Sequence, residues 1–139
     1  MPPVAQILVV EDFKPFREFI TSLLEGQTHL HVICEVSDGL EAVEKAKELI
    51  PDLILLDIGL PGLNGIEVAR QVGKLIPSSR IVFLTQETSA EIVREALGTG
   101  AMGYVVKSQA ANDLLAAIQA ALQSKKFVSS GLDGQGPQA

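Results

Sequence analysis

The chain has 139 residues, of which 47% are hydrophobic, and its formal net charge is −6 at pH 7. This length suits one domain that buries about two-thirds of its unfolded surface, and the apolar fraction argues against disorder over most of the chain. The negative charge argues against binding of a nucleic-acid backbone by this domain, because such binding depends on clustered Lys and Arg.

Five short apolar runs alternate with stretches of helical periodicity. The predicted strands are residues 6–10, 30–36, 53–56, 80–84 and 103–106. Apolar residues spaced three or four apart predict a helix after each strand. The five apolar faces consist, in chain order, of Phe16, Ile20, Leu23 and Leu24; Leu40, Val43, Ala46 and Ile50; Ile66, Ala69 and Val72; Ile92, Val93 and Ala96; and Leu114, Leu115, Ile118 and Leu122.

Strict alternation of strands and helices predicts an α/β fold with right-handed crossovers and helices on both faces of the sheet. We expect a doubly wound, five-stranded parallel sheet of flavodoxin-like strand order 2-1-3-4-5. The runs at 7–10 and 53–56 are almost entirely apolar, which is typical of central strands buried on both faces. The run at 29–36 contains His31, Cys34 and Glu35, which favours an edge position.

Three carboxylates follow the two predicted central strands. Glu11 and Asp12 follow the first of these strands, and Asp57 follows the second. Ligand sites of doubly wound sheets lie beyond the carboxyl ends of the strands, at the switch point of strand order. Two carboxylates ~5 Å apart at an effective dielectric of ~20 repel by about 3 kcal/mol, so such a cluster requires a cation, a proton or a reaction that uses it.

The fourth and fifth predicted strands each add one polar residue to the same edge, Thr85 and Lys107. Carboxylates form a hard oxygen site for Mg²⁺, and a carboxylate beside the metal can attack a phosphoryl group to give an acyl phosphate. Thr85 and Lys107 could then donate to the phosphoryl oxygens. Singly, each residue has a plainer explanation, such as an acidic helix start, a turn aspartate, a helix N-cap or a solvated lysine; their occurrence at four strand ends favours the joint site.

Four segments resemble the receiver domain of bacterial two-component response regulators, and the likeness extends from about Gln6 to Gln123. They are residues 7–12 (ILVVED), 53–65 (LILLDIGLPGLNG), 82–85 (VFLT) and 100–107 (GAMGYVVK). The resemblance implies that Asp57 is the phosphoacceptor, charged by a histidine kinase or a small phosphodonor. It also implies Mg²⁺ binding by Asp12, Asp57 and the Gly59 backbone carbonyl, with Glu11 acting mainly through water.

The resemblance further implies a conformational switch. Thr85 would move towards the phosphoryl group, Tyr104 would change rotamer with it, and Lys107 would pair with it. Position 86, where the family often has a small residue, is Gln here. We expect Gln86 and Glu87 to modulate access of water and phosphodonors to the site, and so the lifetime of the phosphoryl group.

The wording GYVVKS, followed by NDLLAAI at 112–118, is most similar to the NarL/FixJ-type subfamily, whose members usually carry a C-terminal DNA-binding domain. We therefore predict a receiver domain at 1–124 and a flexible tail or the start of a linker at 125–139. A truncated regulator is favoured over a stand-alone receiver, with transcription as the output. A homodimer could form through the fourth helix, fifth strand and fifth helix, or through the first and fifth helices.

Other functions fit these residues less well. A receiver-like module that binds partners without phosphorylation is the main alternative, although it would not need to keep the acids and the lysine together. A phosphatase of the haloacid dehalogenase type needs a second Asp two positions after its nucleophile, where this chain has Gly59. A nucleotide-binding flavodoxin-like protein needs a Gly-rich loop after the first strand, where this chain has EDFK at 11–14.

Targeting features are missing from the sequence. The first residues show no signal peptide, and no apolar run approaches the ~20 residues of a membrane helix, so we expect a cytoplasmic protein without a membrane partner. Cys34 is the one cysteine, which precludes an internal disulfide and favours a small core residue.

Overall fold

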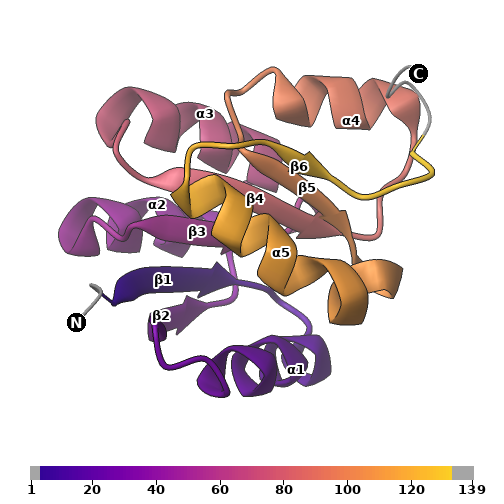
Figure 1. The fold of residues 1–139 in the computed structure, drawn as a ribbon. Coiled ribbons are helices and arrows are strands. Elements are labelled where there is room, and N and C mark those ends of the chain that lie inside the picture. Colours follow the sequence, from indigo (N-terminus) through magenta and orange to yellow (C-terminus); the bar gives the residue numbers. More distant parts are fainter. Residues whose placement is uncertain (1–3, 133–139) are drawn as a thin grey trace.

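A parallel β-sheet with helices on both faces organises the chain (Figure 1). The computed structural model of the protein describes residues 4–132. The strands are β1 (Ala5–Val10), β2 (Leu30–Val36), β3 (Leu53–Leu56), β4 (Arg80–Thr85), β5 (Gly103–Val106) and β6 (Phe127–Val128). The α-helices are α1 (Lys14–Glu25), α2 (Gly39–Leu49), α3 (Gly65–Leu75), α4 (Ala90–Leu97) and α5 (Ala110–Leu122), with a 3₁₀ turn at Lys107–Gln109.

The strand order is β2-β1-β3-β4-β5-β6, and all paired strands are parallel. This confirms the predicted fold class and the order of its first five strands. β1 and β3 lie inside the sheet and β2 lies at an edge, as the apolar patterns of these three strands predicted. No helix among residues 4–132 is long and apolar enough to cross a membrane.

Side chains of successive strand residues enter two separate cores, one on each face of the sheet. One core packs α1 and α5 against Ile7, Val9, Leu53 and Leu55. The other packs α2, α3 and α4 against the alternate residues of the same strands, such as Leu8 and Ile54. Both cores are closely packed, so the sheet is rigid. Because its strands are parallel, the polar residues that follow them are gathered at one edge.

The sixth strand was not predicted. Residues 127–128 pair with β5 beyond the end of the predicted five-stranded sheet, and Ser129 and Leu132 are buried. The structure therefore differs from the predicted tail over residues 127–132, which pack against the domain. The remainder of that predicted tail, residues 133–139, lies outside the described residues.

The predicted apolar face of α2 is wrong at both ends. Leu40 and Ile50 are exposed, whereas Ala42, Val43 and Ala46 are buried. Gly39 starts the helix against the backbone of Leu63, a contact so close that a Cβ would lie 1.9 Å from the Leu63 carbonyl oxygen. Ile50 caps the helix in the left-handed conformation (φ 44°), which turns its side chain away from the core.

Candidate active site

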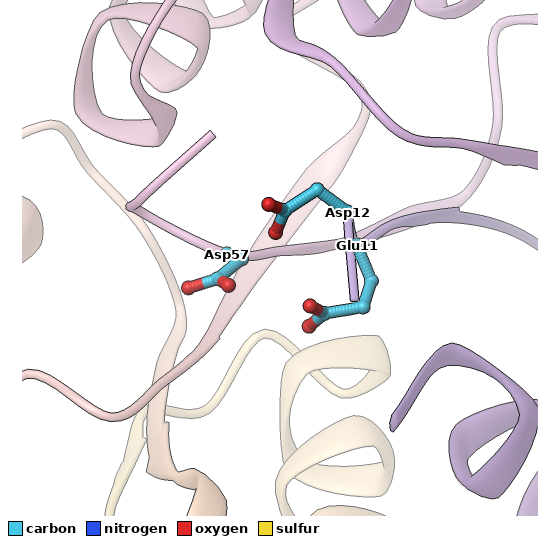
Figure 2. A group of neighbouring side chains, drawn as sticks. All are labelled: Glu11, Asp12 and Asp57. Atoms are coloured by element: carbon cyan, nitrogen blue, oxygen red, sulfur yellow. The ribbon is translucent and has the colours of Figure 1, made fainter. Parts of the chain in front are cut away.

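Three carboxylates converge at the carboxyl edge of the sheet (Figure 2). Glu11 and Asp12 follow β1, and Asp57 follows β3, the strand that pairs with β1. The Asp57 N–H donates to the Val10 carbonyl at 3.2 Å, which extends the ladder and fixes the acid beside Glu11. One carboxylate oxygen from each residue lies within 4.8 Å of the others. Glu11 and Asp57 are buried, while Asp12 is exposed.

Lys107 is shared by two of these carboxylates. Its ammonium nitrogen lies 2.9 Å from Oδ2 of Asp57, 2.9 Å from Oε1 of Glu11 and 3.1 Å from Oε2 of Glu11. The lysine side chain comes from the end of β5, two strands away from β3, and is 17% exposed. One ammonium among three carboxylates leaves the site with an excess of negative charge, which suits it to a further cation.

The protonation equilibria of this network follow from burial and charge. Burial raises the pKa of Glu11, and the hydrogen bond from Lys107 offsets only part of this effect. Burial alone would lower the pKa of Lys107, but its hydrogen bonds to Asp57 and Glu11 prevail and raise it. The ammonium group therefore stays charged at neutral pH, so it can act as a fixed electrostatic donor at this edge.

The start of α1 braces Glu11 and Lys107. The Phe13 N–H donates to Oε2 of Glu11 at 3.0 Å, and Arg17 donates from Nη1 to the Glu11 carbonyl at 2.7 Å. The Phe16 ring lies 4.8 Å from Lys107 Nζ, a cation–π distance. Neither Arg17 nor this role of the Phe16 ring was predicted, because helical spacing marks Phe16 only as a core-facing residue and gives no signal for Arg17.

The loop after β3 holds Asp57 in place. Oδ1 of Asp57 accepts from the Ile58 N–H at 2.7 Å, and the Gly65 N–H donates to the Ile58 carbonyl at 2.8 Å. This return brings the start of α3 against the Asp57 backbone, so that a Cβ on Gly65 would lie 1.9 Å from the Asp57 carbonyl oxygen. Glycine is required here by close approach.

Thr85 and Tyr104 both hydrogen-bond to the backbone of Glu87. The Glu87 N–H donates to Thr85 Oγ1 at 3.3 Å, and the Tyr104 hydroxyl donates to the Glu87 carbonyl at 2.8 Å. Both side chains are fully buried, and the Tyr104 ring lies 6.1 Å from the Phe83 ring. Burial, reinforced by Glu87 and Asp57, raises the pKa of Tyr104, so its hydroxyl remains a donor. The loop between β4 and α4 is thus tied to the ends of two strands.

The predicted site residues surround one small cavity of about 240 Å³. Its lining consists of Asp12, Phe13, Asp57, Gly59, Thr85, Gln86, Glu87 and Lys107. Glu11 reaches this group through Lys107, and Tyr104 lies behind it through Glu87. The structure therefore brings together all nine residues that the sequence singled out.

A larger cavity of about 520 Å³ lies at the other end of the sheet, beside Arg80, Ser124 and Met102. Among the described residues, no acidic side chain or cysteine lines it. Its residues cannot supply the carboxylate chemistry of the smaller cavity, which remains the candidate active site.

Comparisons with known proteins agree on one family. A family model described as the response regulator receiver domain matches residues 7–119. The transcriptional regulatory protein LnrK of Bacillus subtilis (strain 168) is 37% identical over 113 residues, which cover 81% of this chain and 51% of LnrK. The nitrate/nitrite response regulator NarL of Escherichia coli (strain K12) is 35% identical over 128 residues, which cover 92% of this chain and 59% of NarL.

Solved structures give the same result. A two-component response regulator of the LuxR family from Aurantimonas sp. SI85-9A1 superposes with a TM-score of 0.87 at 32% identity, covering 91% of each chain. The response regulator domain of CheB from Thermotoga maritima superposes with a TM-score of 0.80 at 35% identity, covering 86% of this chain and 97% of that one. The chain spans about half the length of LnrK and about three-fifths of NarL.

Gly65 offers a test of how Asp57 is positioned. We expect Gly65→Ala to lower the free energy of unfolding by about 2–4 kcal/mol, because the methyl group must displace the Asp57 carbonyl. Gly73, in the same helix, is the matched control: its Cβ would come no closer than 3.9 Å to Thr99, so Gly73→Ala should add about 0.5–1 kcal/mol. Urea unfolding of the three proteins measures both changes, and equal effects at the two glycines would contradict the close approach.

Glu11 offers a test of the buried charge. Because the folded state holds the Glu11 proton more tightly than the unfolded chain does, protonation stabilises the fold below about pH 4.5, and this contribution is lost as the pH rises through the raised pKa. Glu11→Gln should therefore raise the melting temperature at pH 7 by about 2–4 °C, or about 1 kcal/mol, and the gain should vanish at low pH. Melting curves between pH 4 and 8 measure it. The exposed Glu18→Gln is the control, and a gain that is constant with pH would contradict the assignment.

Proposed function

The chain belongs to the response regulator receiver family, and from this membership we propose that Asp57 accepts a phosphoryl group that controls a conformational switch. The observation that carries the proposal is the ion pair of 2.9 Å between Lys107 and Asp57, in a cavity that Thr85 and two further carboxylates adjoin. The nucleophile Asp57, the ammonium group of Lys107 and a set of carboxylates that can bind a metal ion thus all lie within reach of one phosphoryl group. The cavity size suits a phosphoryl group rather than a large substrate.

The proposed reaction is a transfer between two partners. A carboxylate oxygen of Asp57 forms a bond to the phosphorus of the donor, while the bond from phosphorus to the donor's nitrogen or oxygen breaks and its electron pair leaves with the donor. The product is an acyl phosphate on Asp57. Lys107 then donates to a phosphoryl oxygen, and its raised pKa keeps it charged for this role.

The acidic residues fit a divalent cation. Glu11, Asp12 and Asp57 present oxygen ligands within 4.8 Å of one another, and Gly59 lines the same cavity with its backbone exposed. Mg²⁺ prefers such oxygens and usually retains several waters. We assign its binding to Asp12, Asp57 and the Gly59 carbonyl, with Glu11 acting mainly through water. When bound, Mg²⁺ supplies positive charge that offsets the carboxylates and the incoming phosphoryl oxygens.

The switch is assigned to Thr85 and Tyr104. A phosphoryl group on Asp57 would offer the Thr85 hydroxyl a new acceptor and draw it from the Glu87 N–H. Because the Tyr104 hydroxyl holds the same residue by its carbonyl, a shift of the loop would be felt by Tyr104 and by α4. The phosphoryl group thereby favours one of two arrangements of the loop and shifts their populations.

The entrance to the cavity is assigned a role in the lifetime of the acyl phosphate. Gln86 is exposed and Glu87 is half-buried, and both line the cavity. A polar side chain there lies where attacking water or a phosphodonor would pass, so the two residues are placed to modulate access.

The proposed partners follow from the family. The phosphodonor is a histidine kinase or a small molecule such as acetyl phosphate. The output is control of transcription, since LnrK is a transcriptional regulatory protein and the chain spans only about half of its length. A DNA-binding part would correspond to the remaining length of that relative. Dimerisation through α4, β5 and α5, or through α1 and α5, would transmit the switch.

Phosphorylation itself is the direct test. We expect the intact mass to increase by one phosphoryl group after incubation with Mg²⁺ and acetyl phosphate or phosphoramidate. The gain should disappear in Asp57→Asn and on removal of Mg²⁺, because the acceptor or the charge compensation is then lost. Asp52→Asn, before the start of β3, is the matched control and should be phosphorylated as the wild type is.

A chain that gains no phosphoryl group from these donors or from a histidine kinase would contradict the proposal. That result would favour the alternative, a receiver-like module that binds its partners without phosphorylation.

A further inference from the structure

The segment after α5 completes the sheet instead of leaving the domain. Phe127 and Val128 pair in register with Gly103 and Tyr104 of β5. The Phe127 N–H donates to the Met102 carbonyl at 3.0 Å, and the Ser129 N–H donates to the Tyr104 carbonyl at 2.9 Å. Leu132 then enters the core on the side of α2, α3 and α4. We call residues 127–132 the strap, which lies along the outer edge of β5 (Figure 1).

Ser129 is the polar centre of the strap. The residue is buried, with only 1% of its surface exposed. The hydroxyl oxygen accepts from the Val106 N–H at 3.2 Å, and the hydroxyl donates to Oδ2 of Asp113 in α5 at 2.9 Å. A hydroxyl has one proton to donate, so its donor capacity is used, and it also serves the buried N–H of Val106. Removal of this one hydroxyl would leave a backbone donor and a carboxylate without their partner.

These contacts act on the end of β5 that carries the active-site lysine. Ser129 binds the backbone on both sides of Val105, through the Tyr104 carbonyl and the Val106 N–H. Lys107 follows immediately and reaches Asp57 and Glu11. Tyr104, held at its carbonyl by Ser129, reaches the loop after β4 through its hydroxyl. The same short strand therefore links the strap to both the lysine and the tyrosine of the site.

We propose that Ser129 is a positioning residue for Lys107 and that docking of the strap is coupled to the state of Asp57. The second clause rests on the proposed function, whereas the first concerns the unphosphorylated protein alone. The docked strap stabilises the path of β5 that brings Lys107 to Asp57, and a phosphoryl group on Asp57 gives Lys107 further acceptors on the same path. Because coupling between two sites is reciprocal, phosphorylation in turn stabilises the docked strap.

The first experiment uses the whole unphosphorylated chain and NMR spectroscopy. In Ser129→Ala, we expect amide exchange at Val106 to accelerate about tenfold and the ammonium resonance of Lys107 to shift, because the support of the strand end is lost. Ser129→Thr retains the hydroxyl and should restore both signals. The exposed neighbour Ser130→Ala is the matched control and should resemble the wild type.

A purely structural role for Ser129 would speed amide exchange without moving the Lys107 resonance, and this result would overturn the positioning assignment. A threonine variant that shifts the Lys107 resonance as far as alanine does would overturn its assignment to the hydroxyl.

The second experiment compares the wild type before and after treatment with Mg²⁺ and phosphoramidate, with the phosphoryl group confirmed by mass. Hydrogen exchange of residues 127–132 should slow by about fivefold or more in the phosphorylated protein. Unchanged exchange in a protein that carries the phosphoryl group would overturn the coupling. Absence of the phosphoryl group with phosphoramidate, with acetyl phosphate and with a histidine kinase would instead refute the proposed function and with it the coupling. The Ser129→Ala result would still decide the positioning role.

Discussion

The rest of the site depends on the ion pairs that the Lys107 ammonium group forms with Asp57 and Glu11. Without this ammonium group, three carboxylates would lie together at the carboxyl edge of the sheet, at distances where each pair repels by several kcal/mol. With it, the two buried acids are paired, while exposed Asp12 stays available. Lys107 thus offsets part of the negative charge of the carboxylates. The remaining negative charge can bind a divalent cation, and the ammonium group can donate to a phosphoryl group.

The surrounding fold constrains both partners of this ion pair. Asp57 is fixed by the ladder to β1 and by the return of the chain at Gly65, which admits no side chain. Lys107 is fixed by the short strand β5, whose outer edge is covered by residues 127–132. A displacement of Asp57 or of Lys107 would therefore reach the loop after β4 and the segment after α5, because packed strands transmit small shifts to their neighbours. The backbone contacts that position Asp57 and Lys107 for the chemistry are therefore also the contacts through which the domain would change conformation.

Much of this arrangement could be predicted from the sequence, because polar residues at successive ends of parallel strands meet at one edge. That rule is sufficient to bring Glu11, Asp57 and Lys107 together. It could not find Ser129, since a two-residue strand has no periodicity and a serine in a Ser- and Gly-containing segment resembles a linker. Nor could it foresee Arg17, whose contact depends on how α1 packs. The helical pattern also wrongly predicted that Ile50 is buried, because the spacing of apolar residues does not show that the backbone of Ile50 adopts the left-handed conformation at the end of α2.

The affinity for Mg²⁺ of the wild type and of Lys107→Met, measured by calorimetry, tests the shared ammonium group most directly. If Lys107 offsets the charge of Asp57 and Glu11 as the distances of 2.9 Å require, its removal should strengthen Mg²⁺ binding by about tenfold, equivalent to about 1.4 kcal/mol. Lys126→Met, which removes an exposed lysine outside this network, should leave the affinity unchanged. Equal or weaker binding in Lys107→Met would show that the lysine does not compete for these carboxylates and would contradict the account.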